Sequence, residues 1–173
     1  MVGDLVRLRA MEPSDAEALW RWDHDPEVMR WMDAGYACSR AWVRRWLEER
    51  PRNAFGDALF GIETLTDATL IGLVRLRDAK PETGCAELDL YLGEKQYWGR
   101  GYGTDAVRAV CRYGFDKMRL HKVMLTVVTE NHAAHHVYQK VGFVDEGRLR
   151  QVFRHEGRWY DKYIMGLLES ELH

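Results

Sequence analysis

The sequence predicts an α/β fold, in which a mixed and mostly antiparallel sheet is flanked by helices. The stretch 86–143 has the pattern strand, glycine-rich loop, helix, strand, helix, which is typical of a βαβ unit. Short strands of alternating polar and apolar residues open and close the chain, and helical patterns lie between them. At 173 residues, 46% of them hydrophobic, the chain is expected to form one domain spanning 1–173.

The first half is predicted to hold one strand, three helices and two further strands. Ser14 and Glu17 fit a capping box, Asp25 precedes a proline, and Ser39 precedes an amphipathic segment. Each of these sites is therefore expected to start a helix. The expected strands cover residues 5–10, 55–64 and 69–77.

A glycine-rich loop follows the central strand 87–92. Gly99, Gly101 and Gly103 alternate along it and allow backbone conformations that a Cβ would forbid. Successive N–H groups in such a loop can form a concave anion site, and the N-terminus of a helix, expected at about Thr104, favours negative charge at the same place. The loop therefore predicts a site for a phosphate or pyrophosphate.

The second half continues as helix, strand, helix and closing strands. Asp105 is among the charged residues expected on the solvent face of the first helix. The apolar, β-branched segment 123–128 predicts a buried strand parallel to the central one. Asn131 is expected to cap the next helix, and Gly142 to end it. The closing strands are expected at about 144–148, 151–154 and 159–168.

Two classes of nucleotide-binding protein fit this loop poorly. It lacks the Gly-Lys-Ser/Thr of a P-loop. Gly101-x-Gly103-x-x-Ala106 matches a relaxed dinucleotide fingerprint, but that motif places its glycines directly after the strand, whereas six residues separate Leu92 from even the first loop glycine, Gly99. A nicotinamide-dependent oxidoreductase is kept as an alternative.

Composition and spacing limit the partners. A formal net charge of −2 gives no electrostatic reason to expect nucleic-acid binding. The three cysteines are scattered, and His132 and His136 lack a nearby Cys or Glu to complete a site, so no metal is expected. Neither a signal peptide nor a membrane-spanning run is recognised, and a cytoplasmic protein without a membrane partner is expected.

Three motifs together resemble the GNAT acetyltransferase superfamily, and within it the RimJ/RimL-like branch. They are Tyr97-Trp98-Gly99-Arg100-Gly101-Tyr102-Gly103-Thr104, Glu130-Asn131-His132-Ala133-Ala134 and Tyr138-Gln139-Lys140-Val141-Gly142-Phe143. The resemblance implies that the two central parallel strands splay apart and that acetyl-CoA, a co-substrate, lies in the gap. Homodimers are common in this family, so a homodimer is possible.

The resemblance also implies which residues contact acetyl-CoA. They are Leu90, Tyr91, Leu92, Trp98, Gly99, Arg100, Gly101, Gly103, Thr104, Asn131 and Lys140. Two positions depart from the superfamily pattern. Trp98 stands where Gln or Arg is frequent, which is normal for this branch, and Ala134 stands where many relatives have a serine hydroxyl.

Acetyl transfer to an amine benefits from a proton donor for the thiolate and a base for the amine. The motif places Tyr138 beside the sulfur as general acid; without the motif it would be an ordinary packed aromatic. Glu87 and Asp89 lie two apart on one face of a strand, and Glu87 is preferred as base by resemblance. Both carboxylates could instead be structural, or the amine could lose its proton in solution.

The acceptor pocket is expected opposite acetyl-CoA, walled by the first two helices and the C-terminal hairpin. Its candidate residues are Asp23, Trp31, Asp33, Tyr36, Asp89, Phe153 and Tyr160. The expected reaction is acetyl transfer from acetyl-CoA to a primary amine. A small-molecule acceptor (a polyamine, an amino acid derivative or an antibiotic) is preferred because of the carboxylates. The alternatives are a protein N-terminal α-amine and, in another class, a non-catalytic acyl-CoA sensor.

Overall fold

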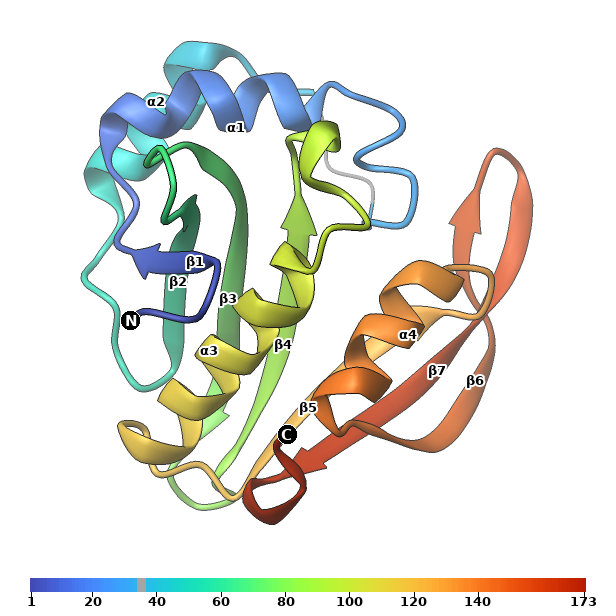
Figure 1. Ribbon diagram of the computed structural model, residues 1–173. Coiled ribbons are helices and arrows are strands. Elements are labelled where there is room, and N and C mark those ends of the chain that lie inside the picture. The colour runs from blue at the N-terminus through green and yellow to red at the C-terminus, as the bar shows by residue number, and fades with distance from the viewer. Residues whose placement is uncertain (34–36) are drawn as a thin grey trace.

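A computed structural model describes residues 1–33 and 37–173, which form one seven-stranded sheet with helices on both faces (Figure 1). The strand order is β1-β2-β3-β4-β5-β7-β6, and only β4 and β5 are parallel. The strands are β1 (Val6–Arg9), β2 (Asp57–Thr64), β3 (Leu70–Lys80), β4 (Cys85–Leu92), β5 (Lys122–Val128), β6 (Val144–His155) and β7 (Arg158–Leu168). The expected mixed, mostly antiparallel sheet is confirmed.

Four α-helices cover this sheet in the described residues. They are α1 (Ala16–Asp23), α2 (Arg40–Glu49), α3 (Tyr102–Asp116) and α4 (His132–Val141). Alternation along the strands divides the core between two faces. Val74 and Leu88 belong to the cluster that packs under α3 and α4, whereas Leu73 and Tyr91 pack with the cluster of α1 and α2.

The parallel pair β4–β5 separates soon after it begins. The paired residues run from Cys85↔Lys122 to Glu87↔Met124. Both strands are described in full, and no residue of β4 beyond Glu87 pairs with β5. Beyond that point β4 stays paired with β3, and β5 stays paired with β7 as far as Val128. Figure 1 shows the two strands diverging toward the glycine loop. The expected splay is therefore present.

Local signals placed three helix ends correctly. The hydroxyl of Ser39 accepts a hydrogen bond from the Trp42 amide (3.1 Å), and the carboxamide oxygen of Asn131 accepts from the Ala134 amide (3.2 Å). Gly142 follows α4 with φ = +116°, the left-handed conformation that glycine adopts most readily.

Two expectations for helix starts were wrong. The Asp25 carboxylate does accept from the amides of Glu27 and Val28, but residues 26–31 form turns instead of a helix. The capping box predicted at Ser14 and Glu17 lies two residues earlier, where the Asp15 carboxylate accepts from the Glu12 amide (2.8 Å). The expected strands 144–148 and 151–154 are one strand, β6, interrupted by bulges.

The prediction that Asp105 lies on the solvent face of its helix was also wrong. It is buried, not solvent-facing, and its carboxylate accepts from the amides of Asp4 (3.0 Å), Leu5 (2.8 Å) and Val6 (3.0 Å). The first turn of α3 thereby holds the segment that leads into β1.

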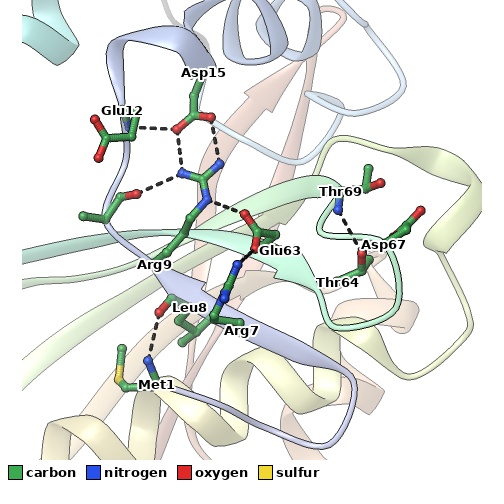
Figure 2. Close-up of polar contacts among 11 residues, drawn as sticks. Met1, Arg7, Leu8, Arg9, Glu12, Asp15, Glu63, Thr64, Asp67 and Thr69 are labelled. Atoms are coloured by element: carbon green, nitrogen blue, oxygen red, sulfur yellow. Dashed lines mark hydrogen bonds and ion pairs between the residues drawn. The ribbon is translucent and has the colours of Figure 1, made fainter.

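A charged network joins β1, β2 and the start of α1 (Figure 2). The buried Glu63 carboxylate on β2 accepts from both Arg7 and Arg9 of β1, with 2.6 Å from Arg9 Nε to Glu63 Oε2. Arg9 also forms a two-point contact with Asp15 (both 2.8 Å). Burial alone would raise the pKa of both carboxyl groups, but Arg9 and Arg7 lower the pKa of Glu63, and Arg9 with the Glu12 amide lowers the pKa of Asp15.

Candidate active site

A cavity of about 610 Å³ opens where β4 and β5 part. Its walls are β4, β5, the glycine loop, α4 and the segment that follows α1. All of the residues expected to contact acetyl-CoA line this cavity, except Arg100. The structure therefore brings together residues between positions 90 and 140 that the sequence analysis grouped only through the family resemblance.

The glycine loop turns sharply into α3. Gly99 and Gly101 have φ values of +69° and +88°, which residues with a Cβ rarely adopt. The helix begins at Tyr102, two residues before the expected Thr104, with Gly101 as its N-cap. Its first backbone bond runs from the Asp105 amide to the Gly101 carbonyl (3.0 Å), which leaves the amides of 102–104 available to an anion. This geometry fits a pyrophosphate.

The free edge of β4 fits the extended arm of acetyl-CoA. Residues 88–92 hydrogen-bond to β3 on one side, and on the other side they face the cavity. The Trp98 indole N–H donates to the Leu92 carbonyl (2.9 Å) and ties the end of the strand to the loop. An amide-containing chain can therefore pair with this edge as another strand would.

Tyr138 lies on α4 at the centre of the site. Its side chain lines the cavity, although the residue is only 7% exposed, and its ring packs edge-on against Phe143 (centroids 5.8 Å apart). Burial, reinforced by the negative charge of Asp89, raises the pKa of the phenol well above its ordinary value. The hydroxyl therefore stays protonated at neutral pH and is available as a proton donor.

Glu87 and Asp89 point to the opposite face of the sheet from α3, as Tyr91 does. Both are bound by one arginine that the sequence argument missed, Arg77 of β3. Its Nη2 is 2.8 Å from Glu87 Oε1, and its Nε is 2.6 Å from Asp89 Oδ2. These contacts raise the pKa of Arg77, with the Asp89 hydrogen bond as the largest cause. The register pair Arg77↔Glu87 explains the contact: two carboxylates on one face require a cation from the neighbouring strand.

Only some of the remaining candidate residues for the acceptor pocket line the cavity. Trp31 and Asp33 line the cavity. Phe153 and Tyr160 lie behind Trp31, with ring centroids 6.4 and 5.5 Å from it. Asp23 is outside the lining and accepts from the Tyr91 hydroxyl (3.3 Å). Tyr36 lies outside the described residues.

Two properties of the described part of the chain bear on other functions. Within residues 1–33 and 37–173, no three His, Cys, Asp or Glu side chains gather into a possible metal site. Over the same residues, every helix is too short or too polar to cross a membrane.

The parted parallel strands, the unpaired amides at the start of α3 and the buried Tyr138 phenol thus border one cavity. A family model described as an acetyltransferase (GNAT) domain matches residues 6–144. The chain therefore belongs to the GNAT acetyltransferase family, whose members use acetyl-CoA, and it is an N-acetyltransferase.

The similarity to its relatives extends over almost the whole chain. It is 30% identical to the uncharacterized N-acetyltransferase p20 of Bacillus licheniformis over 168 residues, which are 96% of this chain and 94% of the relative. It is 28% identical to the spermidine N(1)-acetyltransferase of Vibrio cholerae, covering 96% and 94%. A crystal structure of the V. cholerae spermidine N-acetyltransferase in complex with CoA and spermine superposes with a TM-score of 0.82, at 26% identity and 96% coverage of both chains.

Proposed function

We propose that this protein transfers the acetyl group of acetyl-CoA to the primary amine of a small molecule. The observation that carries the proposal is the continuous cavity through the split sheet. One end has the glycine loop and the free edge of β4, the other has Glu87 and Asp89, and the Tyr138 phenol lines the same space. Donor and acceptor can therefore meet at one point while approaching from opposite faces.

Acetyl-CoA supplies an activated acetyl group, whose bond to sulfur breaks as the bond to the amine nitrogen forms. The N–H groups at the start of α3 bind its phosphates, and the edge of β4 orients its arm. The Tyr138 hydroxyl, which is protonated at neutral pH, donates its proton to the departing sulfur. Asn131 caps α4 and so fixes the helix on which Tyr138 lies.

The amine must lose a proton before or during transfer. Glu87 is the proposed base, acting through water, with Asp89 as its neighbour. Arg77 contacts both carboxylates and keeps them in place. Replacing Glu87 by Gln is expected to lower kcat and to shift the dependence of kcat on pH toward higher pH, because the amine must then lose its proton in solution.

A small acceptor is favoured by relatives whose names specify spermidine and by the solved relative that holds spermine. The alternative acceptor, a protein N-terminal amine, would have to place an extended peptide between Trp31 and the Glu87 side of the sheet.

The decisive experiment is thiol release from acetyl-CoA with a panel of acceptors: spermidine, amino acids, aminoglycosides and short peptides with free N-termini. Turnover with a small amine, with the N-acetylated product identified by mass spectrometry, is expected. Turnover with peptides alone would favour the N-terminal acceptor. Binding of acetyl-CoA without thiol release across the panel would contradict the proposal and favour a sensor.

A further inference from the structure

The acidic side chains around the acceptor end already have cationic partners. Glu87 and Asp89 share Arg77, Asp33 contacts Lys162 (3.2 Å), and Glu27 contacts Lys95 (2.9 Å). A site built for a polycation would be expected to present carboxylates without such partners, because each protein cation competes with the ligand. Asp33 and Asp89, two of the carboxylates that favoured a polyamine from sequence, are therefore already paired, and Asp23, which accepts from the Tyr91 hydroxyl, lies outside the cavity lining.

Two cations at this end have spare capacity for an anion. The Lys162 side chain is only 14% exposed, yet Asp33, its carboxylate partner among the described residues, is 85% exposed. An ammonium group has three donors, and a mostly buried one gains most from further acceptors. Arg30 lines the same cavity, stacks 4.8 Å above the Trp31 ring, and has no carboxylate partner within residues 1–33 and 37–173.

The cations are held in place by aromatic rings. The Lys162 ammonium lies 5.1 Å from the Phe153 ring centre, and the Trp31 ring meets Tyr160 nearly at right angles. Lys162 pairs with Val128 across β5–β7, on the sheet face that also carries Glu87. The amine-binding carboxylates and this cationic, aromatic wall thus lie on the same face of the sheet, on the two sides of the gap.

We infer that the acceptor carries an anionic group beside its amine, and that it is an amino acid or a similar carboxylate-bearing amine. Its carboxylate binds Lys162 and Arg30 next to Trp31, and its amine points toward Glu87 and Asp89. This inference rests on the proposed acetyl transfer and narrows its acceptor. Because the carboxylates of this pocket are paired with protein cations, the chain is distinguished from an acetyltransferase that is specific for polycations.

The test compares acceptors that differ only by a carboxylate: phenylalanine with 2-phenylethylamine, and ornithine with putrescine. The kcat/KM for the carboxylate-bearing member is expected to be about tenfold to a hundredfold higher, the range of one charge-assisted hydrogen bond. Equal values, or a preference for putrescine and spermidine, would overturn the inference while leaving the acetyl transfer intact.

Two substitutions with opposite expected effects separate this site from a polycation site. Lys162→Gln is expected to reduce the preference by raising KM for phenylalanine about tenfold, with the KM for acetyl-CoA unchanged. Asp33→Asn frees the Lys162 ammonium and is expected to lower KM for phenylalanine, whereas in a polycation site it would weaken the acceptor. Arg45→Gln, an exposed change on α2, is the matched control and leaves the preference unaltered.

Calorimetry on the wild-type protein with saturating CoA distinguishes this inference from the proposed function. Binding of phenylalanine but not of 2-phenylethylamine supports the inference even if no amine is acetylated, and that combination would contradict only the acetyl transfer. If neither compound binds and neither is acetylated, the inference is wrong.

Discussion

Replacing Tyr138 by Phe removes one hydroxyl from the centre of the cavity and little else. The ring keeps its packing on Phe143, and the hydroxyl makes no hydrogen bond to another described residue, so the free energy of unfolding should change by less than about 0.5 kcal/mol. General acid catalysis contributes about 10²–10⁴-fold to rate, or roughly 2.7–5.4 kcal/mol of barrier. We therefore expect kcat to fall by at least about 10²-fold.

The assay is steady-state thiol release at saturating amine, combined with the affinity for acetyl-CoA and the thermal midpoint. Tyr113→Phe is the matched control, because Tyr113 packs edge-on against Phe60 outside the cavity. It should lose neither rate nor acetyl-CoA affinity. A Tyr138→Phe protein that keeps more than half of the wild-type kcat would refute the general-acid role.

Two further predictions concern the glycine loop and the charged network. Gly101→Val forces a β-branched residue to φ = +88° and should raise KM for acetyl-CoA at least about tenfold, whereas Gly157→Val, at φ = +77° on the hairpin tip, should cost stability alone. Because folding lowers the pKa of Glu63 and Asp15, their contribution to stability is present above pH ~4.3 and is lost as pH falls further. Thermal midpoints should therefore drop on acidification, and less so in Glu63→Gln.

Two results would contradict these predictions. Equal KM values for the Gly101 and Gly157 variants would mean that the loop conformation does not matter for acetyl-CoA. A thermal midpoint of Glu63→Gln that falls with pH as steeply as the wild type would show that other carboxylates cause the acid sensitivity.

Local and motif signals predicted much of the structure. The hydroxyl of Ser39 and the carboxamide of Asn131 act within three residues along the chain, so sequence alone specifies their caps. The positive φ values of Gly99 and Gly101 follow from a loop that must turn into a helix. The family resemblance supplied the splay of β4 and β5, which no periodicity encodes.

The failures came from contacts between distant segments. Asp105 fits the polar stripe of α3, but three amides near the N-terminus, about a hundred positions away, bury it. Arg77 contacts both Glu87 and Asp89 only because β3 and β4 pair in one register. Sequence therefore showed which carboxylates might gather, but not that these two would share one arginine.

The most direct test of this account compares the affinities of the wild-type protein for CoA and for pantetheine by calorimetry. The loop at the start of α3 is taken to bind phosphates, and the edge of β4 is taken to bind the arm that both compounds share. CoA should bind at least about tenfold more tightly, and its advantage should shrink as salt is added. Equal affinities would contradict the assignment of the glycine loop as the phosphate site and, with it, the orientation of acetyl-CoA in the cavity.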